Sequence, residues 1–440
     1  MKRDEEGFFA HAKEACKIAL SFDEPLIVHH YDADGLSAGA IVIAAMRKNN
    51  KKYRTDCIKK LDDLAIDRYL NNKEKEIIFV DLGGGNKRVN ELQKVVIIDH
   101  HQTDGIEKFQ INPLNFGVDG GEEISAAGVA YCVFREHPEL AIVGAHGDMQ
   151  LPLKGLNKLI LEEGVKNGEI EIENDLKLYG RYSRPLPQFL AYSDEPLLPD
   201  IAFSEEKATE FLLQNGIKVE NENGVKRTYS QLNDTEKKKL IDKLSHLVGR
   251  KQKIVGENYV FPKRPMSECH DASGFSTLLN ACGRHSKEEI GIRICLDLDT
   301  DAYKEAEVLL ANHRRMLREG VVFVSANLQD LGKFYFADGR NLIDEGVIGI
   351  VCGMCIGKKN DKPIIGIANG ENNTIKVSSR ASKKLVENGI NLGSILNEVC
   401  REIRDGAIGG GHRMAAGASI PKDKINEFLI HLGDKIGEVK

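Results

Sequence analysis

Short apolar runs alternate with helical periodicities over the first 150 residues of the chain. Four of the runs predict buried strands: PLIVHH (25–30), EIIFVDL (76–82), KVVIIDHH (94–101) and AIVGAHGD (141–148). Two segments between them have apolar residues at helical spacing: 36–48 and 125–137. Alternation of this kind is typical of a parallel sheet with helices on both faces. The pattern therefore predicts an α/β fold built on a doubly wound parallel sheet.

The rest of the chain divides into segments of different character. Residues 151–260 are more polar and end in a lysine-rich helical pattern at 232–247, so we interpret them as an insertion or helical subdomain. A long amphipathic pattern predicts a connecting helix over 301–320. A second α/β pattern follows, with strands predicted at 347–353, 363–369 and 374–380. The expected organisation is an N-terminal domain begun by 1–150 and completed by 261–300, the insertion 151–260, the helix 301–320 and a smaller α/β domain over 321–440.

Composition restricts the function only mildly. The chain has 61 Lys and Arg against 67 Asp and Glu, and this net charge of −6 is not typical of a nucleic-acid-binding protein. No stretch approaches the ~20 apolar residues of a membrane span and the N-terminus does not resemble a signal peptide, so we expect no membrane contact and a cytoplasmic location. The nine cysteines are scattered, which fits a reducing compartment. Cys352 and Cys355 form a lone CxxC in an apolar run, which we interpret as small core residues on a strand.

Ionisable side chains gather where the predicted strands end. His30, Asp32 and Asp34 are spaced at i, i+2 and i+4, so an extended backbone would place them on one side. The other strand ends carry further groups of the same kind: Asp81, Asp99, His100, His101 and Asp148. Because the carboxyl ends of parallel strands meet at one edge of a sheet, we expect these groups to converge there.

Convergence of so many carboxylates requires positive charge. Carboxylates within ~5 Å repel one another unless a cation neutralises them. A single aspartate at a strand end is more often a helix N-cap than a ligand, and a single histidine is more often a satisfied buried side chain. Four such clusters at equivalent positions instead predict a metal centre. The mixture of imidazole and carboxylate suits Mn²⁺ better than Ca²⁺ or thiolate-bound Zn²⁺, and the number of ligands fits two ions.

These clusters resemble a known family. His30-Tyr-Asp32-Ala-Asp34-Gly35, Asp81, Asp99-His100-His101 and Asp148 resemble, in order, the four motifs of the DHH phosphoesterase superfamily. Gly409-Gly410-Gly411-His412 with the following Ala415-Ala416-Gly417 is similar to the GGGH motif of the associated DHHA1 domain, and Ser378-Ser379-Arg380 is similar to its phosphate-binding S-x-R element. Segments 180–193 and 269–284 look most like the RecJ branch, in particular the archaeal RecJ-like, GINS-associated nucleases. Bacterial RecJ has Asp where this chain has His30, and it has a C-terminal OB domain whose pattern we do not find in this sequence.

The resemblance implies a role for each motif residue. His30, Asp32 and Asp81 would hold one metal ion, and Asp34, Asp81, His100 and Asp148 would hold a second, with Asp81 bridging. Asp99 would orient a ligand histidine, and His101 would face the scissile phosphate. Hydrolysis would follow a two-metal mechanism in which Mn²⁺, or alternatively Mg²⁺, activates a water molecule.

The C-terminal motifs imply phosphate binding. Glycines such as Gly410 and Gly411 let backbone N–H groups approach an anion closely, with His412 beside them. Ser379 and Arg380 would contribute a hydroxyl and a guanidinium fork. Residues 376–413 are locally basic. The segment Ser125–Gly128 could bind a phosphate at a helix N-terminus, and a plain N-cap explains it as well. Four further residues are candidates for lining the path of a strand, although a surface charge is the simpler interpretation for each: Arg184, Arg264, His270 and Arg284.

We therefore expect a Mn²⁺-dependent exonuclease that acts on single-stranded DNA or RNA. One alternative is a phosphodiesterase for very short oligonucleotides or cyclic dinucleotides, which the same core would serve. The other is a non-catalytic replisome scaffold related to Cdc45, although such relatives lose metal carboxylates and every motif position is filled here. The partners that the resemblance implies are single-stranded nucleic acid and replisome components such as GINS.

Overall fold

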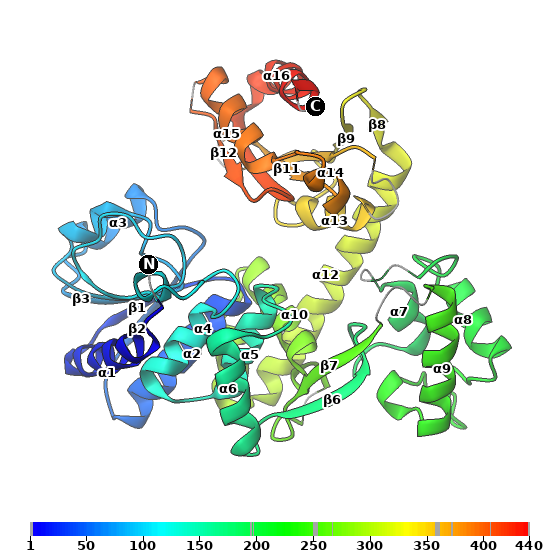
Figure 1. Ribbon diagram of the computed structural model, residues 1–440, viewed down its shortest axis with the longest axis horizontal. Coiled ribbons are helices and arrows are strands. Elements are labelled where there is room, and N and C mark those ends of the chain that lie inside the picture. Colours follow the sequence, from blue (N-terminus) through cyan, green and yellow to red (C-terminus); the bar gives the residue numbers. More distant parts are fainter. Residues whose placement is uncertain are drawn as a thin grey trace. The chain divides into compact units, whose positions relative to one another are not determined.

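The computed structural model describes residues 3–193, 196, 198–249, 254–265, 267–356, 361–370, 373–404 and 406–438 (Figure 1). The chain forms two compact units, which comprise residues 1–310 and 311–440. The long helix α12 (Thr300–Asn327) spans the boundary between them and covers the segment 301–320, where the sequence predicts a helix.

A five-stranded sheet forms the centre of the first unit. Its strands lie in the order β2-β1-β3-β4-β5, and every neighbouring pair is parallel. The strands are β1 (Leu26–His30), β2 (Arg54–Ile58), β3 (Glu76–Val80), β4 (Lys94–Ile98) and β5 (Phe109–Ile111). This arrangement confirms the parallel sheet predicted from the alternating pattern.

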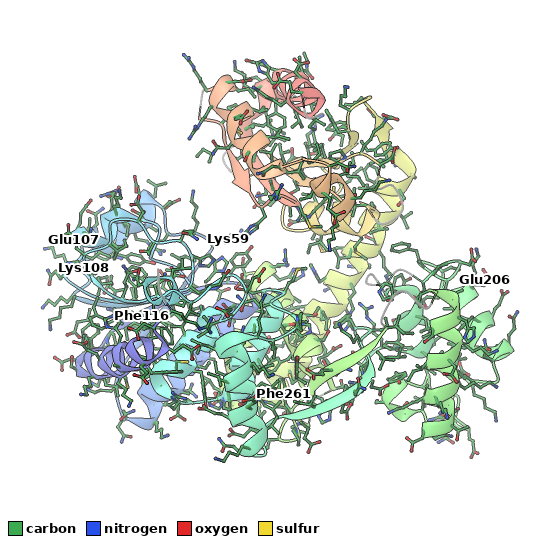
Figure 2. All side chains as sticks on the ribbon, viewed as in Figure 1. Lys59, Glu107, Lys108, Phe116, Glu206 and Phe261 are labelled. Carbon is green, nitrogen blue, oxygen red and sulfur yellow. The ribbon has the colours of Figure 1, made fainter. Side chains whose placement is uncertain are left out.

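Both faces of this sheet are buried. Alternate residues of β3 show why: Ile78 and Val80 belong to a core that includes helices α1, α2, α4 and α5, whereas Ile77 and Phe79 pack with α3 on the opposite face. The helices are α1 (Glu5–Ser21), α2 (Ala33–Lys48), α3 (Asp63–Asn71), α4 (Ala126–Phe134), α5 (Pro138–Gly147) and α6 (Gly155–Lys166). Phe116 (labelled in Figure 2) lies after β5, and its ring makes an edge-to-face contact with Phe8 of α1, which packs α1 against this core.

The chain leaves this core and later returns to it. An antiparallel pair, β6 (Glu171–Leu176) and β7 (Val255–Val260), leads to a subdomain with its own apolar core. Its helices are α7 (Leu186–Ala191), α8 (Glu205–Gln214) and α9 (Asp234–Leu247). After β7 the chain re-enters the first core through Phe261, which is fully buried (Figure 2), and through α10 (Ala272–Arg284) and α11 (Glu288–Asp297).

The second unit contains a six-stranded mixed sheet. The strand order is β12-β13-β11-β10-β9-β8, antiparallel except for the β9–β10 pair. The strands are β8 (Gln329–Asp330), β9 (Tyr335–Asp338), β10 (Ile364–Asn369), β11 (Thr374–Arg380), β12 (Ile408–Gly411) and β13 (Ala415–Pro421). The helices are α13 (Ile348–Ile356), α14 (Lys383–Glu387), α15 (Leu392–Ile403) and α16 (Ile425–Glu438). Short 3₁₀ helices in the two units are η1 (Lys87–Glu91), η2 (Pro113–Phe116), η3 (Tyr229–Gln231), η4 (Ser267–Cys269) and η5 (Lys422–Lys424).

Two predicted strands are helices instead. The run 141–148 lies in α5, which begins at Pro138, a residue whose fixed φ favours the first helical turn. The run 347–353 lies in α13. Both runs are apolar on all sides, and a fully buried helix and a fully buried strand share that composition. Cys352 and Cys355 are buried free thiols, as predicted for core residues, but on a helix.

Among the described residues, no helix combines the length and the apolar composition that crossing a bilayer requires.

Candidate metal centre

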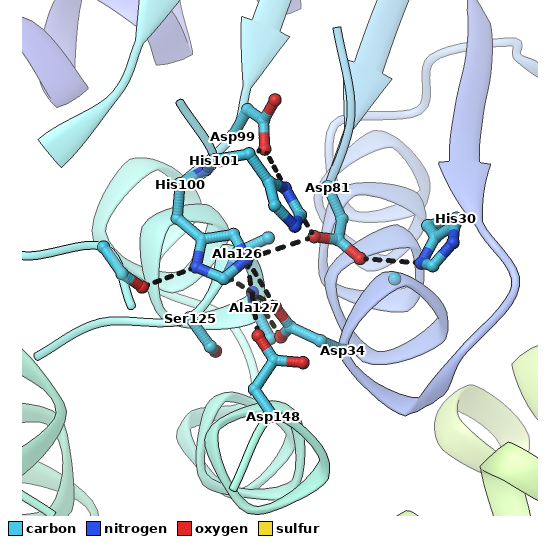
Figure 3. Close-up of polar contacts among 12 residues, drawn as sticks. His30, Asp34, Asp81, Asp99, His100, His101, Ser125, Ala126, Ala127 and Asp148 are labelled. Carbon is cyan, nitrogen blue, oxygen red and sulfur yellow. Dashed lines mark hydrogen bonds and ion pairs between the residues drawn. The ribbon is translucent and has the colours of Figure 1, made fainter. Parts of the chain in front are cut away.

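His30 and Asp34 lie where β1 ends and α2 begins (Figure 3), and Asp32 is the N-cap residue of α2 between them. His30 is the last residue of β1. Asp32 caps α2 by accepting a hydrogen bond from the Gly35 N–H at 3.0 Å, and Asp34 lies in the first helical turn. The expected extended spacing is therefore wrong, because the strand ends at His30. The abrupt change from strand to helix still delivers all three side chains to the carboxyl edge of the sheet.

Asp81 and His100 follow the neighbouring strands β3 and β4. The backbone of Asp81 is left-handed, with φ +62°, and its N–H donates to the carbonyl of Ile98 at 2.9 Å. A left-handed non-glycine residue is strained and persists where surrounding contacts enforce it, which is common at functional sites. Both side chains are buried, at 2% exposure for Asp81 and 6% for His100.

Asp148 reaches the same edge from a helix. The prediction that it follows a strand is wrong: it is the C-cap of α5, and its N–H donates to Gly144. Its carboxylate nevertheless lies 3.3 Å from Nε2 of His100. Helix α5 packs against α2 and α4, and this packing brings its C-terminal end to the carboxyl ends of the strands.

Three groups of three possible ligands form at this edge. Two of them match the predicted metal sites: His30, Asp32 and Asp81, and Asp34, His100 and Asp148; the third, Asp81, His100 and His101, shares one residue with each of these two. Within each group, one ligand atom from each residue lies within 4.8 Å of the others. Asp81 reaches both groups, since Oδ2 lies 3.3 Å from Nδ1 of His30 and Oδ1 lies 3.4 Å from Nε2 of His100 (Figure 3). The structure thus brings together the same residues that the resemblance assigns to two metal ions.

The carboxylates of this cluster repel one another. Burial, followed by the charge of Asp81, raises the pKa of Asp34 to about 7. Burial and the charge of Asp34 hold the pKa of Asp148 well above its ordinary value. Carboxyl groups that resist ionisation in this way indicate a site that lacks positive charge, and a divalent cation would supply it.

The histidines show the complementary effect. Burial opposes the charge on His30, but the nearby carboxylates of Asp32 and Asp81 outweigh it and raise its pKa to about 11. Burial likewise opposes the charge on His100, and Asp81 is the strongest of the carboxylates that raise its pKa. In the metal-free protein, the protonated rings of His30 and His100 therefore supply the positive charge that metal ions would otherwise provide.

The geometry of these atoms fits metal ions better than hydrogen bonds. Nδ1 of His30, Oδ1 of Asp81 and Nε2 of His100 are buried, and none makes a hydrogen bond of acceptable geometry, although each lies 3.4 Å or less from an oppositely charged atom. These three atoms are close enough to interact but are not aligned for hydrogen bonding, which is the arrangement expected of ligands that point at a metal ion between them. Imidazole nitrogens and carboxylate oxygens together suit Mn²⁺, so these residues fit that ion.

Asp99 and His101 lie beside these groups. Asp99 was expected to orient a ligand histidine, but its Oδ1 contacts Nδ1 of His101 at 2.9 Å and accepts the backbone N–H of His100 at 2.8 Å. The His101 side chain is 59% exposed, whereas Asp99 is fully buried. The hydrogen bond to Asp99 raises the pKa of His101. His101 is thus an oriented, solvent-facing imidazole that favours the protonated form.

The ring of the ligand candidate His100 is oriented by a residue that the sequence did not single out. Its Nδ1 lies 2.7 Å from the carbonyl oxygen of Gly120. The available signal was the Gly120-Gly121 pair in a polar loop, which marks backbone that must approach another group closely.

The N-terminus of α4 is already occupied by a carboxylate. The N–H groups of Ala126 and Ala127 donate to Asp34 at 2.7 and 2.9 Å, and Gly128 donates to Oγ of Ser125 at 3.2 Å. The phosphate site considered at this helix is therefore wrong, and the N-cap interpretation of Ser125 is confirmed. The helix N-terminus instead fixes both oxygens of Asp34 and stabilises its negative charge.

The glycine motif of the second unit lines a pocket beside α15. The pocket has a volume of about 540 Å³, and its lining includes Gly410, Gly411, His412, Asn397, Arg401 and Arg413. Gly411 adopts φ +138°, a conformation that favours glycine. Two arginines and exposed glycine backbone outweigh the single carboxylate of Glu398 in this lining, which makes the pocket suitable for an anion.

The S-x-R residues do not line this pocket. Arg380 lies against α13, where its guanidinium occupies space that a β-carbon on Gly349 would need. Ser379, which was expected to bind phosphate, is fully buried and donates its hydroxyl to the carbonyl of Ala416 at 3.0 Å. Ser378 alternates with it along β11 and shares the face of Arg380, but it is also buried. Arg380 is therefore the member of this motif with partial exposure.

Comparisons with known proteins agree with this arrangement. Three family models match the chain: the DHH family N-terminal domain at residues 25–152, the DHH-CID domain at 178–254 and the DHHA1 domain at 332–438. The uncharacterized protein MJ0831 of Methanocaldococcus jannaschii is 34% identical over 455 residues, which cover 97% of this chain and 98% of that protein.

Solved structures share the fold at low identity. Cdc45 from Entamoeba histolytica matches with a TM-score of 0.67 and 13% identity over 100% of both chains. RecJ from Thermus thermophilus in complex with Mn²⁺ matches with a TM-score of 0.61 and 16% identity over 99% of this chain. This chain spans only 55% of the length of that RecJ. With its DHH and DHHA1 domains, the chain belongs to the DHH phosphoesterase superfamily and has a RecJ-like fold.

Proposed function

We propose that this protein is a metal-dependent phosphodiesterase that removes nucleotides from a free end of single-stranded DNA or RNA in the cytoplasm. The observation that carries this proposal is the carboxylate of Asp81, which reaches two separate groups of ligand atoms. A non-catalytic scaffold has no need of buried, mutually repelling carboxylates at this edge of the sheet, because they destabilise the metal-free fold.

Mn²⁺ is the proposed ion, with two ions per chain and Mg²⁺ as the alternative. The RecJ of Thermus thermophilus that shares this fold was crystallised with Mn²⁺, and the ligand types here suit the same ion. His30, Asp32 and Asp81 would hold one ion, and Asp34, Asp81, His100 and Asp148 would hold the other. When bound, the ions would lower the pKa of a water molecule and neutralise charge on the phosphoryl oxygens.

His101 is proposed to contact the scissile phosphate. Asp99 accepts a hydrogen bond from its Nδ1, so Nε2 is left to face a substrate, and the raised pKa favours a protonated ring. A protonated imidazole can donate a charge-assisted hydrogen bond to a phosphate oxygen as negative charge develops there.

The second unit is proposed to bind the phosphates of neighbouring nucleotides. The pocket with Gly410, Gly411 and His412 offers backbone N–H groups and the guanidinium groups of Arg401 and Arg413. The backbone N–H groups of the glycine loop recognise phosphate and do not read base edges, so we expect little sequence preference and binding that weakens with salt.

Single strands are the proposed substrate because the metal ligands are recessed. Asp34, Asp81 and His100 are each less than a tenth exposed. The scissile phosphate of a duplex would therefore have to move away from the duplex surface to reach them. A single strand can bend into such a site more readily than a paired one.

Digestion of single strands labelled at the 5′ or the 3′ end, in DNA and RNA form with Mn²⁺ present, tests this function and reports the polarity. A matched blunt duplex and a closed circular single strand serve as controls. We expect stepwise shortening of the linear strand and resistance of both controls. Equal cutting of the circle would contradict the requirement for an end, and cleavage limited to strands shorter than about five nucleotides would favour the small-substrate alternative.

A replisome factor such as GINS is the proposed protein partner. The fold shared with Cdc45 over the whole chain and the DHH-CID match at 178–254 support an additional binding role for this nuclease. Co-purification of the full chain with a GINS complex tests it, and a complex that does not survive gel filtration would contradict it.

A further inference from the structure

The carbonyl oxygen of Gly120 accepts two buried hydrogen bonds. Nδ1 of His100 lies 2.7 Å from it, and Nε2 of Gln150 donates to it at 2.9 Å. Gln150 is only 5% exposed and His100 is 6% exposed, so water does not compete freely at this point. A carbonyl oxygen has two lone pairs, and here both have a partner.

The first of these bonds fixes the tautomer of His100. A carbonyl can only accept, so the proton must reside on Nδ1 of the ring. Nε2 is then the atom that faces the carboxylates of Asp148 and Asp34, at 3.3 and 3.8 Å. The position of the Gly120 carbonyl therefore decides where the ligand nitrogen of His100 points.

The second bond fixes the Gly120 carbonyl. The side-chain nitrogen of Gln150 faces two carbonyls, those of Gly120 and Ile124, the latter at 3.4 Å. Its oxygen accepts a hydrogen bond from Nδ2 of Asn157 at 2.7 Å, and Asn157 is fully buried. Because carbonyls cannot donate, only one orientation of each amide satisfies these contacts.

The backbone contact at this point leaves no room for a side chain. A β-carbon on Gly120 would lie 2.1 Å from the backbone oxygen of His100. The loop therefore approaches the histidine as closely as the chain permits, and Gln150 holds it there.

Gln150 is also linked to two residues of the ligand group Asp34, His100 and Asp148. It follows Asp148 by two residues, and its backbone N–H donates to Ala145 of α5 at 2.9 Å. One residue is thus linked to Asp148 through the chain and to His100 through Gly120. Groups that orient ligand histidines in this way commonly set the affinity for the metal.

We propose that Gln150 is a positioning residue for the metal site formed by Asp34, His100 and Asp148. This inference rests on the proposed metal centre. Gln150 does not contact the ion or the substrate; it acts by holding the Gly120 carbonyl against His100.

Mn²⁺ titration of Gln150→Met, followed by electron paramagnetic resonance and calorimetry, tests the inference without measuring activity. Methionine has a similar shape and cannot donate. We expect the Kd for one of two Mn²⁺ ions to rise by about 10-fold or more, with the other unchanged. Ile160→Ala is the matched control, because Ile160 lies in α6 with Asn157 and contributes only apolar packing. It should lower Tm without changing either Kd.

The double variant Gln150→Met/Asn157→Leu separates positioning from stability. Replacing both buried partners removes the unsatisfied amide, so Tm should recover towards the wild-type value while the weakened Mn²⁺ site remains weak. Recovery of both Tm and Kd would overturn the inference, as would a Gln150→Met protein that binds both ions like the wild type. If the wild-type chain binds no Mn²⁺ at all, the proposed metal centre fails, and the inference fails with it.

Discussion

Oδ1 of Asp81 lies 3.4 Å from Nε2 of His100, although the two residues follow different strands. Oδ2 of the same carboxylate lies 3.3 Å from Nδ1 of His30 (Figure 3). The nearby imidazoles of His100 and His30 overcome the effect of burial and hold the pKa of Asp81 well below its ordinary value. Asp81 is therefore the carboxylate that remains charged between the two ligand groups, and it is suited to bridge two cations.

The substitution Asp34→Asn should remove the second metal ion and leave the first. Asp34 accepts the N–H groups of Ala126 and Ala127, and an asparagine must turn its amide nitrogen towards one of these donors. Equilibrium dialysis followed by metal analysis should find about one Mn²⁺ per chain, and Mn²⁺ should raise Tm by less than in the wild type. A variant that keeps two ions would show that Asp34 is not a ligand.

Arg380→Ala should weaken substrate binding, whereas Ser379→Ala should lower the stability of the fold. Arg380 is partly exposed, and loss of its guanidinium fork should raise KM for a single strand by about 10-fold or more with kcat little changed. Ser379 is buried against Ala416, so its loss should lower the free energy of unfolding by about 1 kcal/mol without affecting KM. Steady-state kinetics and urea unfolding measure both effects. Metal analysis is the control, since loss of Mn²⁺ from Arg380→Ala would mean that its role is misassigned.

Glu139→Gln should destabilise the first unit at neutral pH. Arg264, which the sequence suggested as a surface charge, is buried and donates to Glu139 at 2.8 Å and to the carbonyls of Ile294 and Cys295. Burial opposes the charge on Glu139, but His137 and Arg264 outweigh it and lower its pKa to about 2. Breaking this buried pair should cost about 3 kcal/mol.

The effect of Glu139→Gln should depend on pH in a defined direction. The pKa of Glu139 is lower in the folded protein than the ordinary value of about 4.3, so its contribution is complete above pH ~4.3 and is lost as the pH falls towards 2. Urea midpoints of wild type and variant should therefore differ at pH 7 and converge at acid pH. A difference that is constant with pH would contradict the ion pair.

The candidate site was predictable because its chemistry is local. His30 ends one apolar strand, and Asp81 and His100 lie within two residues of the ends of two others. Parallel strands bring their carboxyl ends together whatever the details of the loops. The sequence did not reveal that Asp148 ends a helix, because α5 is buried on nearly all sides and has no polar face to mark its period. Asp148 was still predicted as a ligand from its residue type, although the element before it is a helix and not a strand.

The supporting contacts were not predictable for a physical reason. Gly120, Gln150 and the N-terminus of α4 act through hydrogen bonds between segments that are distant in sequence. The Gly120-Gly121 pair marks a close backbone approach but does not identify its partner. The same holds for Ser379, whose place in the S-x-R motif suggested a ligand but whose side chain points into the core from β11. Side-chain direction along a strand alternates, so a motif of three residues does not determine which of its members is accessible.

Hydrolysis of an end-labelled single strand by wild-type protein and by Asp81→Ala, each with Mn²⁺ and with a chelator, tests the central claim most directly. The two-metal account predicts stepwise shortening by the wild type with Mn²⁺, none with the chelator, and less than about 1% of that rate for Asp81→Ala, because both ions lose a shared ligand. Circular dichroism must show that the variant is folded. Cleavage by folded Asp81→Ala at a rate near that of the wild type, or cleavage by the wild type that persists in the chelator, would contradict the account.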